Sequence, residues 1–335
     1  MLDGKSILVT GATGSFGRAF VEHTIKRYKK IKRLVVFSRD ELKQHEMSML
    51  HSTNKFPFLR YFIGDIRDKS RLTSALEDID YVVHAAALKQ VPSTEYNPIE
   101  AIKTNVIGAQ NIIEACIDKN VKKIVALSTD KAVSPINLYG ATKLCSDKLF
   151  LSANNIIGKK DISFSIVRYG NVLGSRGSVL SNFIQQKKKG VINITDKNMT
   201  RFHILLSESI DMVLWSLKNC MGGEVLIPKL PSYKILDFAN AICSKCKIKY
   251  TGIRPGEKIH EDLIASSESR DTLDIGKYYV VINNYNKKIY NFYVNKCKAK
   301  KVSGNFVYNS KTNKIFLSSI QLKRIIDKEI KNNLQ

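Results

Sequence analysis

An apolar segment followed at once by a glycine turn and an amphipathic helix opens this chain. Residues 5–10 form a short run suited to a buried strand, and residues 16–29 carry apolar side chains at helical spacing. Between them lie Gly11, Gly14 and Gly17, in the spacing G-x-x-G-x-x-G. The missing side chains allow a tight turn and let a phosphate approach the backbone at a helix N-terminus. This order of strand, turn and helix predicts a dinucleotide-binding fold.

The same strand pattern recurs through the first half of the chain. Short apolar runs that predict buried strands lie at 33–37, 59–63, 81–84, 123–127 and 164–168, with helical stretches between them. Strands that alternate with helices indicate an α/β protein with a Rossmann-type, doubly wound parallel sheet.

The second half of the chain has a different character. After about residue 170 the strand signals shorten, and the loops are rich in Gly, Pro and Arg. We therefore expect a Rossmann domain that binds NADP over residues 1–170. Residues 171–335 should form mainly a smaller C-terminal domain that binds the substrate over the strand ends, with segments that could return to the sheet.

Cysteines and apolar runs bear on the compartment. No segment approaches the length of a membrane span, and the start of the chain lacks a signal-peptide pattern, so we expect a cytoplasmic protein without membrane insertion. The six cysteines are scattered, which favours reduced thiols. Cys243 and Cys246 have metal-ligand spacing but lack a second pair, so we expect no metal site.

The formal charge of +24 allows two interpretations. Clustered Lys and Arg attract nucleic acid or anionic lipid, whereas a Lys-, Asn- and Ile-rich composition can simply solvate a surface. Here the lysines are spread along the chain. We favour the second interpretation and expect no nucleic-acid partner, although a positive field would also attract an anionic small molecule.

Tyr139 and Lys143 form the strongest catalytic motif. A tyrosine four residues before a lysine lies on the same helix face, so the ammonium can lower the pKa of the phenol and favour a phenolate base. With the glycine turn, this pair predicts oxidation or reduction of an alcohol by a nicotinamide cofactor. The lysine would also hold the nicotinamide ribose.

The end of the second predicted strand bears on the choice of cofactor. Ser38 and Arg39 stand where NAD enzymes usually have an acidic residue for the ribose 2′-hydroxyl, and Lys43 follows one turn later. A guanidinium suits a 2′-phosphate, which favours NADP. Asp40 argues for NAD if its carboxylate turns inward. Asp65 follows the third strand and either holds the adenine amino group or caps a helix.

Longer motifs carry a family resemblance over nearly the whole chain. They are Phe-Ser-Arg-Asp-Glu-Leu-Lys at 37–43, Ala-Ala-Leu-Lys-Gln-Val-Pro at 86–92, Glu-Tyr-Asn-Pro at 95–98, Ser-Thr-Asp-Lys-Ala at 128–132, the segment 168–178 and Arg-Pro-Gly-Glu-Lys at 254–258. The chain resembles the extended short-chain dehydrogenases/reductases that act on nucleotide sugars, and among them the inverting UDP-N-acetylglucosamine 4,6-dehydratases of pseudaminic acid biosynthesis. The resemblance implies homo-oligomers, often hexamers. Residues 265–300 match the family only weakly.

The resemblance also implies a set of catalytic roles. Tyr139 would take the C4 hydroxyl proton while NADP, tightly bound and recycled, takes the hydride, and Thr129 would hydrogen-bond the sugar. Retaining relatives carry Asp-Glu where this chain has Asp130-Lys131. We expect Lys131 to remove the C5 proton, with a pKa depressed by burial, and Asp130 to protonate the departing C6 hydroxyl. The alternative for this pair is a helix cap followed by a solvated lysine.

The remaining predicted contacts divide between cofactor and substrate. For the cofactor we expect Gly11, Thr13, Gly14, Ser15, Phe16, Gly17, Ser38, Arg39, Asp40, Leu42, Lys43, Asp65, Ile66, Ala85, Ala86, Ala87, Lys89, Tyr139 and Lys143. For UDP-N-acetylglucosamine we expect Lys89, Asn171, Arg176, Ser178, Thr195, Arg201, Arg254 and Glu257. Two rival functions are a C4 or C5 epimerase of the same family and a non-catalytic module that senses NADP or binds nucleic acid.

Overall fold

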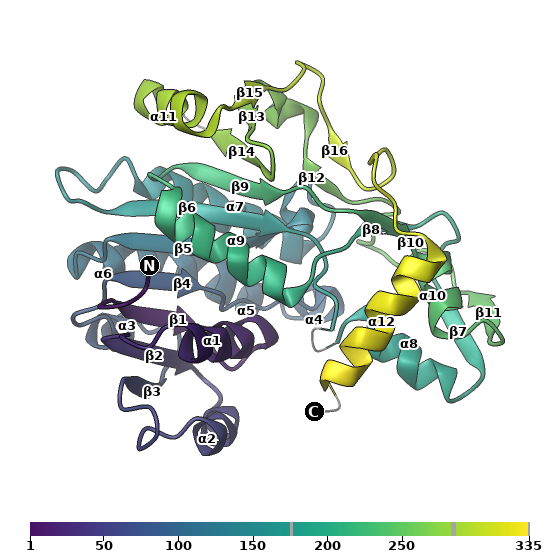
Figure 1. Ribbon diagram of the computed structural model, residues 1–335, viewed down its shortest axis with the longest axis horizontal. Helices are drawn as coiled ribbons and strands as arrows, with labels where there is room; N and C mark the ends of the chain where they lie inside the picture. Colours follow the sequence, from purple (N-terminus) through teal and green to yellow (C-terminus); the bar gives the residue numbers. More distant parts are fainter. Residues whose placement is uncertain (175–176, 283–285, 334–335) are drawn as a thin grey trace.

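A ten-stranded sheet runs through the described part of the chain, residues 1–174, 177–282 and 286–333 of a computed structural model (Figure 1). Its order is β15-β13-β14-β9-β6-β5-β4-β1-β2-β3. The parallel strands are β1 (Ser6–Thr10), β2 (Arg33–Ser38), β3 (Leu59–Ile63), β4 (Tyr81–His84), β5 (Lys123–Thr129), β6 (Ser163–Tyr169) and β9 (Glu224–Pro228). The predicted strands of the first half and the Rossmann-type fold are confirmed.

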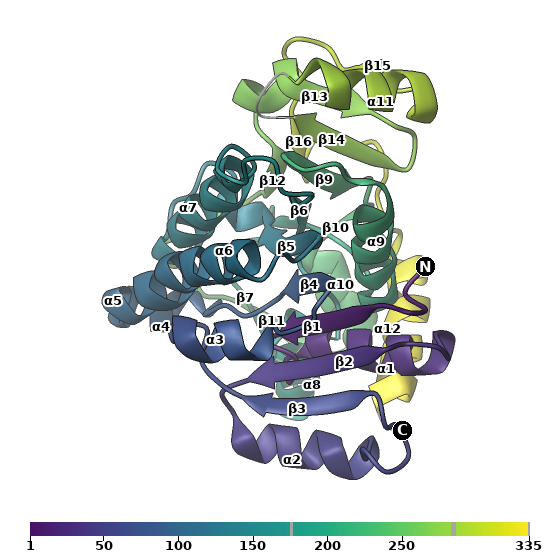
Figure 2. The same ribbon diagram turned by 90° about the vertical axis from the view of Figure 1, so that its left-hand side faces the viewer.

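Helices cover both faces of the sheet, which explains why strands such as β1 are buried along their whole length (Figure 2). One face is covered by α1 (Ser15–Arg27) and α9 (Leu206–Asn219). The other is covered by α3 (Lys69–Ala75), α6 (Gly108–Asp118) and α7 (Leu138–Ala153), with α4 (Val91–Tyr96), α5 (Pro98–Ile102) and the π-helix η1 (Lys103–Ile107) leading into α6. The helix α2 (Glu41–Leu50) follows β2 beside β3.

The second half of the chain extends this sheet. The strand β9 pairs with β6 in parallel, and β14 (Tyr278–Ile282), β13 (Thr272–Asp274) and β15 (Lys300–Lys301) continue in antiparallel register. The strands before residue 170 include the one that leads into the glycine turn. The residues after it contribute both to the sheet and to a second lobe. The division into two domains at that residue stays a prediction.

A smaller lobe packs around its own apolar core. It contains α8 (Val179–Lys187), α10 (Ile235–Ile242) and α12 (Ser319–Asn333), with β7 (Val191–Ile194) beside β11 (Lys247–Tyr250) and β8 (Thr200–Phe202) beside β10 (Ser232–Lys234) (Figure 1). The amphipathic helices α8, α10 and α12 supply Phe183, Phe238 and Leu322 to that core.

One expectation about the cysteines is wrong. Cys243 and Cys246 form a disulfide at the end of α10, whereas Cys116, Cys145, Cys220 and Cys297 are free thiols. The chain turns from α10 into β11 at this point, which brings the two Cα atoms to 5.4 Å, within reach of such a bond. The sequence shows the close spacing of these two cysteines, but not the turn that brings their thiols together.

Buried charges join the later segments to the sheet. Arg168 on β6 lies between Asp147 on α7 and Glu268, at 3.7 Å and 2.9 Å. Glu268 belongs to the 3-10 helix η3 (Ser266–Asp271), which follows β12 (Asp262–Ile264); β12 pairs with β16 (Tyr308–Asn309), and α11 (Lys287–Cys297) follows β14. The sequence leaves residues 265–300 undefined, and within them the strands β13, β14 and β15 lie at one edge of the sheet.

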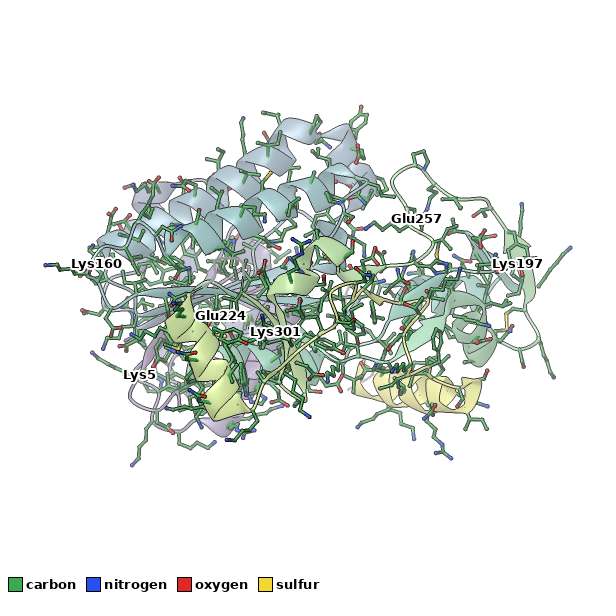
Figure 3. All side chains as sticks on the ribbon, turned by 90° about the horizontal axis from the view of Figure 1, so that it is seen from above. Lys5, Lys160, Lys197, Glu224, Glu257 and Lys301 are labelled. Carbon is green, nitrogen blue, oxygen red and sulfur yellow. A yellow bond between two sulfur atoms is a disulfide. The ribbon has the colours of Figure 1, made fainter. Side chains whose placement is uncertain are left out.

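Two further properties of the described residues are the distribution of basic side chains and the character of the helices. The basic side chains Lys160 and Lys197 stand at opposite ends of the molecule (Figure 3). No helix within the described ranges has the length and apolar character needed to cross a bilayer.

Candidate active site

A cavity of about 1130 Å³ opens where the carboxyl ends of the parallel strands meet the smaller lobe. Its wall begins at the glycine turn after β1, passes the ends of β2, β4 and β5, and reaches the loop 251–261 of the second half. Crevices at the strand ends of open α/β sheets are the usual ligand sites. The volume suits an extended ligand or two ligands end to end.

The glycine turn shapes one end of this cavity. Gly11 has a φ of 63°, and a Cβ there would lie 2.8 Å from the backbone nitrogen of Ala86. Only glycine therefore lets the turn pack against the segment after β4. Gly14 is the N-cap of α1, so the first backbone N–H groups of that helix face a ligand at this end.

Most of the predicted cofactor residues belong to the wall of this cavity, and the glycine turn is among them. Those that line the cavity are Gly11, Thr13, Gly14, Ser15, Phe16, Gly17, Ser38, Arg39, Asp40, Lys43, Ile66, Ala85, Ala86, Ala87, Lys89, Tyr139 and Lys143. The carboxylate of Asp40 accepts a hydrogen bond from the backbone of Lys43 at 2.9 Å and pairs with its ammonium, so it caps α2. Arg39 remains about half exposed beside it.

Two predicted cofactor residues do not reach the cavity wall. Leu42 lies on α2 and is 64% exposed. Asp65 is hydrogen-bonded to the Arg67 side chain at 2.7 and 2.9 Å and lies 3.5 Å from Arg39. Burial raises the pKa of Asp65, but these arginines outweigh it and hold the pKa below its ordinary value. The carboxylate is thus part of an ion-pair network, and Asp68 is the residue that caps the following helix α3; a contact of Asp65 with adenine stays a prediction.

Tyr139 stands at the centre of the cavity wall, near the start of α7. Burial raises the pKa of its phenol to about 12, against the charge of Lys131 and a hydrogen bond with Thr129, which lower it. Lys143 is buried one turn later, and its pKa falls because of that burial, although Asp147 opposes the change. Lys131 is thus a cation that lowers the pKa of Tyr139, and the same effect of Lys143 stays a prediction.

Lys131 is held by oxygen atoms from three parts of the chain. Its Nζ lies 3.0 Å from Asp130 Oδ1, 3.2 Å from Asn171 Oδ1 and 3.4 Å from Glu261 Oε1. Burial lowers the pKa of Lys131, but the carboxylates of Asp130 and Glu261 outweigh it and raise the pKa above its ordinary range. The expected depressed pKa is therefore wrong, because two anions face this ammonium.

Asp130 also differs from its predicted position. It opens the 3-10 helix η2 (Asp130–Ala132), its side chain is fully buried, and it does not line the cavity. A Cβ on Gly170 would come within 3.0 Å of Asp130 Oδ2, so that oxygen faces the backbone after β6. The carboxylate stands behind Lys131 rather than beside a ligand.

Most predicted substrate residues also line this cavity. These are Lys89, Asn171, Ser178, Thr195, Arg201, Arg254 and Glu257, while Arg176 lies outside the described residues. Arg201 donates hydrogen bonds to the carbonyls of Thr200, Ile259 and Lys258. Its guanidinium therefore supports the loop that carries Glu261 rather than pointing freely at a phosphate.

Arg254 is the most accessible of these arginines. It is 69% exposed, and its Nε lies 3.0 Å from Glu257, which raises its pKa and orients the guanidinium. Glu257 comes from the loop between the two lobes (Figure 3). An oriented guanidinium at a cavity mouth suits a diphosphate.

Three residues of the site were not predicted from the sequence, because no motif marks them. Glu261 lines the cavity 130 positions after Lys131. Asn105 on η1 holds the loop after β4 by bonding both backbone groups of Leu88, and π-helical turns often mark functional sites. Asn137 caps α7 and donates to the carbonyl of Gly256, which ties the two halves together across the cavity.

The fold and this cavity define a member of the extended short-chain dehydrogenases/reductases. Its glycine turn, its parallel sheet and the Tyr139 and Lys143 pair of α7 lie together in one structure. The family of polysaccharide biosynthesis proteins matches residues 7–283, and the chain belongs to it.

Relatives and solved structures are similar over most of the chain. The UDP-N-acetylglucosamine 4,6-dehydratase (inverting) of Campylobacter jejuni is 48% identical over 98% of each chain. The UDP-glucose 4-epimerase of Rickettsia akari is 41% identical over 83% of each. The X-ray structure of Pen from Bacillus thuringiensis superimposes with a TM-score of 0.89 at 35% identity and covers both chains fully.

Proposed function

We propose that this protein is an inverting UDP-N-acetylglucosamine 4,6-dehydratase that uses NADP. The proposal rests on one observation: Tyr139, Lys131 and the glycine turn line the same cavity. Lys131 lies close enough to Tyr139 for its charge to act on the phenol. An alcohol base and a second basic group next to a cofactor site are what an oxidation followed by an elimination requires. The 48% identity with the Campylobacter jejuni dehydratase supports the substrate.

The reaction follows from these side chains. Bound NADP would supply a hydride acceptor for C4 of the sugar and later a hydride donor for C6. Tyr139 removes the proton of the C4 hydroxyl, and Thr129 orients that hydroxyl. The resulting 4-ketone acidifies the C5 proton, which Lys131 removes. The C6 hydroxyl takes the proton that Tyr139 accepted from the C4 hydroxyl and departs as water. Reprotonation of C5 on the other face gives a 4-keto-6-deoxy sugar of L-configuration.

The choice of NADP over NAD rests on the end of β2. Arg39 is about half exposed at the cofactor end, and Lys43 stands beside it. Asp40 is engaged with Lys43 and the start of α2, which leaves the ribose site without a free carboxylate directed at a 2′-hydroxyl. A 2′-phosphate would find the half-exposed Arg39 guanidinium there, while the Lys43 ammonium is paired with Asp40.

The family resemblance extends the proposal beyond the single chain. The product is proposed to enter pseudaminic acid biosynthesis, and the protein to work as a homo-oligomer, with a hexamer as the form that the resemblance implies. Light scattering on the purified protein measures that assembly directly.

Product mass tests the proposed reaction. Purified protein incubated with UDP-N-acetylglucosamine should give a product lighter by about one water, with deuterium at C5 when the solvent is D₂O. Lys131→Ala or Tyr139→Phe should abolish the 4-keto sugar while NADP stays bound, which fluorescence titration checks. Normal turnover by either variant would remove this mechanism.

A C4 epimerase is the second candidate, because the Rickettsia akari relative is named a UDP-glucose 4-epimerase. An epimerase would use Tyr139 and the nicotinamide cofactor but would return the hydride to C4 without losing water. Its product would have the mass of the substrate and no deuterium at C5. The same incubation therefore separates the two functions.

A further inference from the structure

In its ammonium form Lys131 cannot accept a proton, because the nitrogen has no lone pair and each of its N–H groups can be directed at an oxygen. Its Nζ faces three oxygens, from Asp130 at 3.0 Å, Asn171 at 3.2 Å and Glu261 at 3.4 Å, and an ammonium has three N–H donors. In this arrangement Lys131 is an acid rather than a base. Removal of a C5 proton requires the free amine, so one of the groups around Lys131 has to accept its proton first.

Glu261 is the carboxylate of this group that reaches the cavity. It lines the wall yet is only 2% exposed, and among the described residues its Oε2 has no hydrogen-bond donor. Its backbone is held by Ser310, which donates to the carbonyl and accepts from the N–H. A buried carboxylate oxygen without a donor is costly as an anion, and protonation relieves that cost.

The charges around Glu261 nearly balance. Asp130 adds a negative charge, whereas Lys131, Arg201 and Lys258 are positive, and Arg201 Nε lies 3.6 Å from Glu261. Burial raises the pKa of Glu261, and Lys131 is the largest opposing influence. Burial likewise lowers the pKa of Lys131, so both groups shift toward an uncharged pair when more water leaves the site.

We propose that Glu261 is the positioning residue that accepts the ammonium proton of Lys131 and thereby supplies the free amine that removes the C5 proton. The inference rests on the proposed function. The N–H bond of the ammonium breaks, an O–H bond forms on Glu261, and the neutral pair replaces the ion pair without a change in net charge. The amine then takes the C5 proton and returns to the ammonium form.

Asp130 does not fit this role equally well. Its side chain is completely buried and outside the cavity wall, so a bound sugar changes its surroundings little. Its Oδ2, like Oε2 of Glu261, has no donor among the described residues, but its Oδ1 accepts hydrogen bonds from Thr129 and Lys131, each at 3.0 Å, which stabilise the anion. Glu261 and Lys131 meet at the cavity wall, so a sugar that enters the cavity removes water from their contact. Loss of this water favours the uncharged pair.

Glu261→Gln tests the proposal, with Asp262→Asn as the matched control. Asp262 is the next residue but lies outside the cavity wall, where its carboxylate accepts a hydrogen bond from Asn309 at 2.7 Å. The NADP-loaded full-length protein is given UDP-N-acetylglucosamine in D₂O from pH 6 to 9, and deuterium uptake at C5 is followed by NMR. The transient reduction of the cofactor, which depends on Tyr139, is followed by absorbance.

With Gln at 261, C5 exchange at pH 7 should slow by about 10²-fold and then rise about tenfold per pH unit, because only bulk solvent can deprotonate Lys131. The wild type and Asp262→Asn should show a flat profile, and all three should reduce the cofactor at similar rates. Glu261→Asp keeps an acid at this position, so it should be slower than wild type with a flat profile; this variant tests the idea even if Glu261→Gln does not fold.

Faster or unchanged exchange in Glu261→Gln at pH 7 would overturn the proposal. A carboxylate that only stabilises the ammonium would give that result, since its removal lowers the pKa of Lys131. A wild type that makes no lighter product refutes the proposed function itself. If the wild type makes the lighter product and the Glu261→Gln variant shows normal exchange, the proposed function stands and only the role of Glu261 is refuted.

Discussion

The protonation of each side chain in this cavity depends on the charged groups around it, and the sequence reveals only the neighbours that are close along the chain. The sequence places Tyr139 and Lys143 on one helix face, and the structure has both on the cavity wall. It does not reveal that the charge of Lys131 also acts on Tyr139, or that Glu261 faces Lys131 from the other half. The residue types were therefore predictable, whereas their protonation states were not.

Arg39 gives a prediction at the scale of one side chain. It is about half exposed at the cofactor end, and its Nη1 lies 3.5 Å from Asp65, so its guanidinium has capacity left for a phosphate. Arg39→Ala should weaken NADP binding about tenfold, as the loss of one charged contact worth about 1.4 kcal/mol implies. Binding of NAD serves as the control and should change little. Isothermal titration that shows equal losses for both cofactors would exclude a contact with the 2′-phosphate.

At the scale of elements, the strands of the first half were predictable because each is a short apolar run flanked by polar segments. The predicted run at 59–63 coincides with β3, and that at 81–84 with β4. The strands β9 and β14 were expected only as unspecified return segments, since their pairing joins residues fifty or more positions apart in the chain. Register between such distant strands depends on packing that local periodicity does not encode.

Gly140 gives a prediction about how two elements meet. It lies in the first turn of α7, where alanine would ordinarily stabilise a helix by about 1 kcal/mol. Here a Cβ would clash with the carbonyl oxygen of Lys131 and approach Pro135 at 3.1 Å. Gly140→Ala should therefore destabilise the protein by about 1–3 kcal/mol and displace Lys131, which slows C5 exchange more than cofactor reduction.

The matched control for that change is Gly304→Ala, because nothing lies within 4 Å of its added methyl group. Urea unfolding compares the stabilities, and the D₂O assay compares the exchange rates. A stabilised Gly140→Ala variant with normal exchange would show that α7 and η2 can separate without harm to the site.

The whole molecule is a single sheet with a second lobe set over its strand ends, and the site lies where the two meet. The sequence predicts this arrangement from the change in pattern near residue 170, but not the contacts that hold it. Arg168 joins α7 and η3 through Asp147 and Glu268, and Asn137 reaches Gly256 across the cavity. Such buried polar contacts, rather than a flexible linker, set the distance between cofactor and substrate ends.

Buried histidines should make the stability of the whole molecule depend on pH. His84 ends β4 with its Nδ1 2.8 Å from the Thr10 hydroxyl, and burial lowers its pKa from 6.5 to about 3. His203 is buried too, with its pKa lowered to about 4. A depressed pKa in the folded state stabilises the protein above the unfolded pKa, and this stabilisation is lost as the pH falls below 6.5. Asp147 and Glu224 act in the opposite sense, because burial raises their pKa values.

His84→Gln isolates one of these contributions, because glutamine keeps a polar group near Thr10 but cannot titrate. Between pH 7 and pH 5 the unfolded imidazole becomes protonated while the folded one stays neutral. Wild type should therefore lose about 2 kcal/mol of unfolding free energy relative to the variant over that range. Urea denaturation of both proteins at the two pH values gives the difference directly. An equal pH dependence in the two proteins would mean that His84 can take up a proton within the folded sheet, and the packing of β4 against β1 and Phe150 would have to loosen to admit it.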